Sequence, residues 1–144
     1  MPPPQARGIE RIDATRAIHI GEHIAVWRSD AEQWQHAIYV GPMAIGQPGG
    51  LEDAVATVYG GARIGVRLVP LRQFLASDRR IVRVEYAFDS EEQLLAAAGA
   101  AVRSARQGIA VSHSGGFAHG CRSGNSSWFP YDLPPPNAKN NTQW

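Results

Sequence analysis

Four short stretches of the chain have the pattern of apolar and polar positions that is typical of strands. Apolar β-branched and aromatic residues cluster at 23–27 and 37–40, and apolar residues alternate with charged ones at 66–69 and 81–86. Such residues favour strands, and regular alternation indicates a strand with one buried face. The polar segment 28–33 has a length that suits a hairpin turn between the first two stretches. The pattern therefore predicts at least four strands, which we expect to be antiparallel.

A longer pattern after the last strand has the period of a helix. Ser90 and Gln93 form the signature of a capping box, and Gly108 can adopt the left-handed conformation that ends a helix. Apolar residues recur at helical spacing between them, at Leu94, Leu95, Ala98, Ala101, Val102 and Ala105. Residues 71–76 suit a short helical turn. We therefore expect an α+β fold, in which a small antiparallel sheet of four or more strands packs against one main helix.

Length and composition indicate one domain with a tail at each end. With 144 residues, of which 44% are hydrophobic, the chain can bury about two-thirds of its unfolded surface. Three consecutive prolines occur near the start and three more, with asparagines, near the end, and neither end has an apolar period. We expect flexible tails at 1–8 and 130–144 and an ordered domain at 9–129. The glycine-rich segment 41–65 has no readable pattern.

Charge and cysteine content exclude several classes of protein. The net charge is +1 and the Lys and Arg residues form no stripe, so the chain carries no strong signal for nucleic-acid binding. A single cysteine excludes an internal disulfide framework and suits a reducing compartment. No run approaches the ~20 apolar residues of a transmembrane segment. The first residues lack the features of a secretory signal, so a cytoplasmic location is the expectation.

Two histidine-containing segments are arranged like the halves of a cysteine-histidine active site. The first joins Gly-Glu-His-Ile at 21–24 with Gln-His-Ala-Ile-Tyr-Val-Gly at 35–41, and the second is Ser-His-Ser-Gly-Gly-Phe-Ala-His-Gly-Cys at 112–121. In order and spacing they resemble the H-box and NC box of the lecithin:retinol acyltransferase-like (LRAT-like) proteins. This branch of the NlpC/P60 superfamily includes the picornavirus 2A proteins of the H-box/NC type. The resemblance covers about 21–124, includes the 69–75 segment, and implies an NlpC/P60-like fold.

The resemblance places a serine where the family has its cysteine nucleophile. The family's chemistry needs a thiolate at the start of a helix, where the helix dipole stabilises negative charge. Aligning the NC box on Phe117 and Cys121 puts Ser114 in the nucleophile position and His113 in place of the family's asparagine. A hydroxyl needs a stronger activating base than a thiol does. Two glycines follow at 115–116, and because glycine disfavours helix we expect the helix to start late or fray.

The resemblance also implies that the general base is missing. The proton acceptor of the H-box lies four residues before the tyrosine, Tyr39, which places it at Gln35, and an amide cannot accept that proton. A further histidine of the family falls at or near Gly46. Because neighbouring strand residues point to opposite faces, we expect His36 to project away from the site. We also expect no histidine ring nitrogen within about 3.2 Å of Ser114 Oγ, and hence a degenerate site with no catalytic residues.

A rearranged site is the alternative. Ser114 or Cys121 could act as nucleophile with His36 or His113 as base, which would give an acyltransferase or phospholipase A-type enzyme. Each residue also has a structural interpretation: a turn or N-cap serine, a small buried thiol on a helix, and a hydrogen-bonded histidine of the core or surface. His113, His119 and Cys121 fit no common zinc spacing, so we expect no metal and no cofactor.

Two classes of function follow from the resemblance. The first is a non-catalytic domain that binds other proteins, as is thought for the viral 2A relatives, which would support replication by engaging host or viral proteins in the host cytoplasm. The second is the acyltransferase or phospholipase. The altered boxes favour the first. The segment that holds Trp128, Phe129 and Tyr131 among prolines could also dock, as an extended chain, in another protein's groove.

Overall fold

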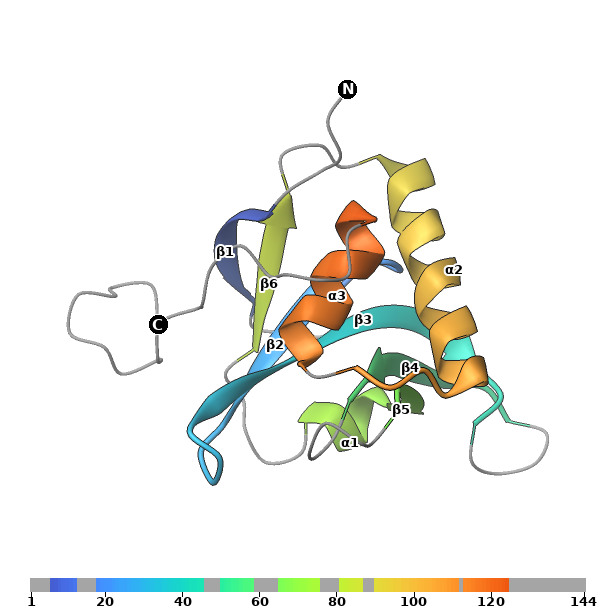
Figure 1. Cartoon of the computed structure of the whole chain (residues 1–144), viewed down its shortest axis with the longest axis horizontal. Coiled ribbons are helices and arrows are strands. Elements are labelled where there is room, and N and C mark those ends of the chain that lie inside the picture. The colour runs from blue at the N-terminus through green and yellow to red at the C-terminus, as the bar shows by residue number, and fades with distance from the viewer. Residues whose placement is uncertain are drawn as a thin grey trace.

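The computed structural model describes residues 6–12, 18–45, 50–58, 65–75, 81–86, 90–111 and 113–124. A six-stranded sheet forms its centre, with the strand order β1-β6-β2-β3-β4-β5 and antiparallel pairing throughout (Figure 1). The strands are β1 (Ala6–Ile12), β2 (His23–Arg28), β3 (Gln33–Met43), β4 (Glu52–Thr57), β5 (Arg67–Pro70) and β6 (Ile81–Tyr86). The helices are α1 (Leu71–Leu75), α2 (Glu91–Gln107) and α3 (Ser114–Ser123). The predicted α+β class and antiparallel sheet are confirmed.

The hairpin of β2 and β3 forms where the sequence predicts it. Arg28 pairs with Gln33 across the turn, and Glu32 takes a positive φ of 51° within it. This closure fixes the register, so that Ala25 pairs with His36. The register matters for the site, because it decides which side chains share a face of the sheet.

Two strands lie where the sequence pattern gave no strand. β4 falls inside the glycine-rich segment, and β1 begins at Ala6, so the expectation of a tail over 1–8 is wrong for residues 6–8. β1 pairs with β6 through main-chain hydrogen bonds, which leave little trace in side-chain periodicity. The predicted tail at 130–144 lies outside the described residues.

Each face of the sheet carries its own apolar core. On one face, α2 and α3 cover a cluster that includes Ile38, Ala56 and Phe117 (Figure 1). On the other face, α1 and the segment before β2 cover a cluster that includes Ile24 and Phe74. Strand side chains alternate between these two cores, so both faces of the central strands are apolar.

The helix α2 forms as predicted, with one difference in the face that it buries. The Ser90 hydroxyl accepts from the Gln93 main-chain N–H at 3.1 Å, the Gln93 side chain accepts from the Ser90 N–H, and Gly108 ends the helix with a φ of +62°. Ala97 is buried, whereas Leu95 is 54% exposed. The apolar stripe of α2 is therefore wider than the surface that the sheet covers.

The helix α3 begins directly at Ser114, so the expectation of a late or frayed start is wrong. His113 is the N-cap, and its Nδ1 accepts a hydrogen bond from the Gly115 N–H at 3.0 Å. A Cβ at Gly115 would lie 2.9 Å from the His113 ring and 3.3 Å from His36 Cδ2. Glycine thus lets the cap form and lets the helix approach the sheet, which offsets its low helix propensity.

None of the described helices combines the length with the apolar character that a membrane-crossing helix requires.

Candidate functional site

The start of α3 lies against β3 and places Ser114 beside the strand that carries Gln35 and His36. Ser114 is the first residue of the helix, and its Oγ accepts a hydrogen bond from the main-chain N–H of His36 at 3.0 Å. Within the described part of the chain, no imidazole nitrogen is hydrogen-bonded to this oxygen. The position at a helix start suits a nucleophile, but the group that holds the hydroxyl is an amide donor and not a base.

His36 and Gln35 lie on the opposite faces from those predicted. His36 is 3% exposed and lies on the face that α3 covers, because its Cδ2 is close to Gly115. Gln35 lies on the other face, where it accepts from Arg28 Nε and donates to the Val58 carbonyl at 3.0 Å. The expectations that Gln35 occupies the base position and that His36 projects away are therefore wrong. The reason is that Tyr39 points into the α1 side of the sheet, so counting back four residues from it reaches the wrong face.

His23, which the resemblance included in the first segment without giving it a role, joins the site. His23 Nε2 lies 2.7 Å from His36 Nδ1, and His23 Nδ1 lies 2.8 Å from Tyr86 Oη. His23 is fully buried and Tyr86 is 3% exposed. The signal was present in the sequence, because a turn closed by Arg28 and Gln33 makes His23 a diagonal neighbour of His36 on one face.

The two buried imidazoles are held neutral by their surroundings. Burial, and then the neighbouring His113, lowers the pKa of His36 to about 3. Burial lowers the pKa of His23 well below its usual value, with further contributions from His36, Arg122 and His119. A single proton lies between His23 Nε2 and His36 Nδ1, because a second one would set two N–H groups against each other. The pair is consequently a weak base near neutral pH.

A further group of buried side chains extends the histidine pair toward the end of α3. The Tyr86 ring stacks on the His119 ring at a centroid distance of 6.0 Å, and the Arg122 guanidinium lies 4.3 Å from the centroid of the Tyr86 ring. Ser123 Oγ donates to the His119 carbonyl at 2.8 Å. These contacts fasten the second half of α3 to β6, so the cluster contributes to the packing of the helix on the sheet.

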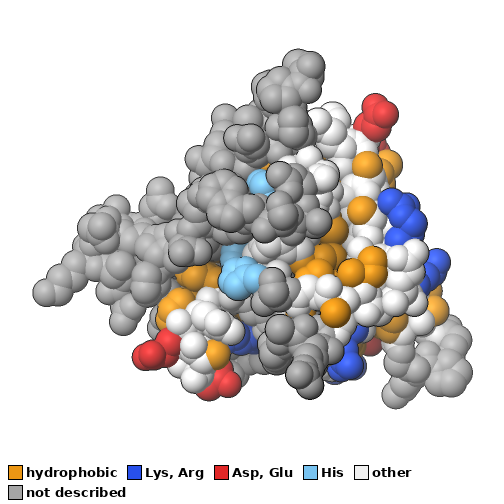
Figure 2. Space-filling model, viewed as in Figure 1, with side chains coloured by type: hydrophobic (Ala, Val, Ile, Leu, Met, Phe, Trp, Pro, Cys, Tyr) orange, Lys and Arg blue, Asp and Glu red, His pale blue; other side chains and the backbone are white. Residues whose placement is uncertain are grey.

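His113 and Cys121, the other residues of the predicted rearranged site, have other contacts than a hydrogen bond to Ser114 Oγ among the described residues. His113 is exposed and uses Nδ1 to cap α3, and the centroid of its ring lies 6.2 Å from that of His36. The face that α3 covers is viewed in Figure 2, where histidine side chains reach the surface near hydrophobic ones. Cys121 packs against the apolar cluster under α2 and α3, and burial raises the pKa of its thiol to about 12. A thiol of this kind is not a nucleophile at neutral pH.

The described residues contain no group of three or more His, Cys, Asp or Glu side chains arranged to hold a metal ion. Gly46, to which the resemblance assigns the position of a further histidine, lies outside the described residues. Comparisons with protein-family models, with curated proteins and with solved structures found no match to this chain.

Proposed function

We propose that this chain is a non-catalytic domain of the H-box/NC-box, LRAT-like type, and that it acts by binding other proteins. The observation that carries the proposal is the hydrogen bond from the His36 main-chain N–H to Ser114 Oγ. A serine nucleophile needs a base that removes its proton, whereas a donor that points at the oxygen makes the hydroxyl a poorer nucleophile.

The state of the histidines supports the same proposal. A general base works best when its pKa lies near the operating pH, and burial lowers the pKa of His36 to about 3. The Nδ1 of His36 is occupied by His23. A buried, neutral, hydrogen-bonded pair of this kind is what a structural role requires, because buried polar groups are stable only when they are paired.

An acyl-transfer enzyme is the second candidate, and one observation favours it. His36 and His23 lie on the same face of the sheet as Ser114, and the second histidine orients the first at 2.7 Å. A nucleophile at a helix start, a histidine and a third polar group that orients it form the arrangement of a hydrolytic triad. Rotation of the Ser114 hydroxyl away from the main chain would be required before this arrangement could act.

A turnover assay distinguishes the two candidates. Purified protein is incubated with phospholipid in mixed micelles and, separately, with an acyl thioester, and the release of fatty acid and of free thiol is measured. The binding proposal expects no product above the protein-free blank, and identical results for the wild type, Ser114→Ala and Cys121→Ala. Release of product that Ser114→Ala abolishes and Cys121→Ala leaves unchanged would replace the binding proposal with the enzyme.

A further inference from the structure

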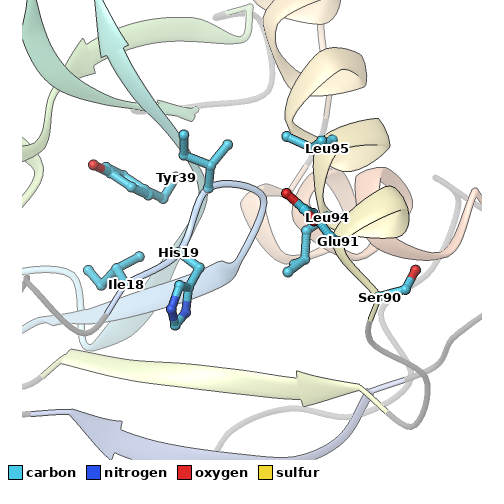
Figure 3. A pocket seen from close by; sticks show the side chains of 8 residues that line it. Ile18, His19, Tyr39, Ser90, Glu91, Leu94 and Leu95 are labelled. Carbon is cyan, nitrogen blue, oxygen red and sulfur yellow. The ribbon is translucent and has the colours of Figure 1, made fainter.

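An open apolar pocket lies away from Ser114, between the segment that precedes β2 and the first turns of α2. Its volume is about 610 Å³, within the range of ligand-binding pockets. Ile18 and Tyr39 line one side, and Leu94 and Leu95 line the other (Figure 3). Neither Ser114 nor the two buried histidines line it, so the pocket is a separate feature of the fold.

Two exposed apolar side chains lie together at this pocket. Ile20 is 39% exposed and Leu95 is 54% exposed, and both line it. They are two of the four large hydrophobic residues that are exposed in the described part of the chain, the other two being Leu51 and Ile109. Grouped apolar exposure at a hollow marks a surface that another molecule covers, whereas a single exposed leucine needs no explanation.

The walls of the pocket are held in place by main-chain contacts. Gly21 has a φ of +95°, and a Cβ at this position would lie 2.0 Å from the Leu94 carbonyl oxygen, so only glycine allows the turn to sit against α2. The Gly21 N–H donates to the Tyr39 carbonyl at 2.7 Å, and the Tyr39 N–H donates to the Glu22 carbonyl at 3.0 Å. A pocket formed in advance binds with little loss of conformational entropy.

Acidic side chains lie at the pocket among the described residues, and His19, which is hydrogen-bonded to Glu22, also lines it. Glu91 lines it, Glu92 follows, and both side chains are exposed on the first turn of α2. On the opposite wall the Tyr39 hydroxyl donates to Asp53 at 3.0 Å. On β6, Arg83 is paired with Glu22 at 3.2 Å. The carboxylates of the described rim therefore favour cationic groups over anionic ones.

We propose that this pocket binds a protein segment in which leucine-type side chains are flanked by lysine or arginine. The apolar walls take the aliphatic side chains, while Glu91 at the rim, followed in the sequence by the exposed Glu92, attracts the basic ones. Large hydrophobic anchors in a preformed pocket supply most of the affinity of such a contact, and the surrounding charges supply orientation and rate. This proposal rests on the binding function proposed above and gives it a surface and a class of partner.

The test uses two synthetic helical peptides with the same leucine spacing, one with lysines and one with glutamates at the remaining positions. Each carries fluorescein, and its anisotropy is followed as full-length protein is added at low ionic strength. The lysine peptide is expected to bind and the glutamate peptide to bind at least roughly tenfold more weakly. Leu95→Asp should lower the affinity for the lysine peptide by roughly tenfold or more, since it places a charge in the apolar wall. Leu51→Asp is the matched control and should change its binding by less than about twofold, because Leu51 is 73% exposed and does not line the pocket.

A charge reversal completes the test. Glu91→Lys should lower the affinity for the lysine peptide and raise the affinity for the glutamate peptide. Circular dichroism verifies that each variant is folded. Equal binding of both peptides, or binding that Leu95→Asp leaves unchanged, would overturn the proposal. It would also fail if a fatty acid bound the pocket in place of the lysine peptide, or if sedimentation showed that a second copy of the chain covers it. None of these results bears on the chemistry of Ser114, which the turnover assay tests separately.

Discussion

We expect the buried histidine pair to make the stability of the domain sensitive to mild acid. His36 has a pKa of about 3 in the folded protein, against about 6.5 for an unfolded chain, so between these values only the unfolded state takes up the proton. Stability is fully present above pH 6.5 and is lost as the pH falls toward 3. For His36 alone the free energy of unfolding should fall by about 2 kcal/mol between pH 7 and pH 5. The pKa of His23 is also lowered, so protonation of this residue in the unfolded state lowers the free energy of unfolding further as the pH falls.

The assay is urea unfolding at pH 7, 6 and 5 at constant ionic strength, followed by tryptophan fluorescence, to which the buried Trp34 contributes. His36→Asn removes the titrating ring and keeps a polar atom near the position of Nδ1. This variant should be less stable than the wild type at pH 7 by about 1 to 3 kcal/mol, because the bond to His23 is weakened. Between pH 7 and pH 5 its free energy of unfolding should fall by about 2 kcal/mol less than that of the wild type.

His19→Asn is the matched control, because the His19 side chain is 76% exposed and lies outside the pair. It should retain the full acid sensitivity of the wild type. The reasoning would be refuted if the wild type lost less than about 0.5 kcal/mol over this range, or if His36→Asn and the wild type had parallel pH profiles.

Three other changes follow from the contacts of α3. Ser114→Ala removes the acceptor for the His36 N–H and should lower the free energy of unfolding by about 1 kcal/mol in urea titrations. An unchanged free energy of unfolding would contradict the hydrogen bond. Gly115→Ala should lower the free energy of unfolding by about 1 to 3 kcal/mol, since its Cβ would meet two histidine rings. The Cβ of Gly99→Ala in α2 meets only the flexible tip of an arginine, so this control should raise the free energy of unfolding by about 0.5 to 1 kcal/mol. Equal effects of the two substitutions would contradict the packing of Gly115. Cys121, with a pKa of about 12, should resist iodoacetamide at pH 8 in the native protein and react once it is unfolded, as intact mass will show.

Much of the fold could be predicted because its signals are local. The capping box of α2, its glycine cap and the alternation in β6 depend on residues close in sequence. The strand β1 was not predicted because it is stabilised by pairing with a strand about seventy residues away, which side-chain pattern does not encode. The strand β4 was hidden by the glycines around it.

The candidate site could be predicted only in part. The resemblance implies a helix start at Ser114, and the structure has one there, whereas the late or frayed start expected from the two glycines is wrong. The alignment on Tyr39 assigned Gln35 and His36 to the wrong faces. A one-residue error in register exchanges the two faces of a strand, so the error affected both residues at once. The pairing of His23 with His36 follows from the hairpin register and not from any motif.

The most direct test of the account is the reactivity of Ser114 toward a fluorophosphonate probe, measured as the intact mass of the native protein. Fluorophosphonates phosphonylate serines that a base has activated and leave ordinary serines unmodified. The account predicts no added mass on the wild type after prolonged incubation, and the same result for His36→Ala. Stoichiometric addition to Ser114 in the wild type, abolished by His36→Ala, would show that the histidine pair is a working base and that the domain is an enzyme.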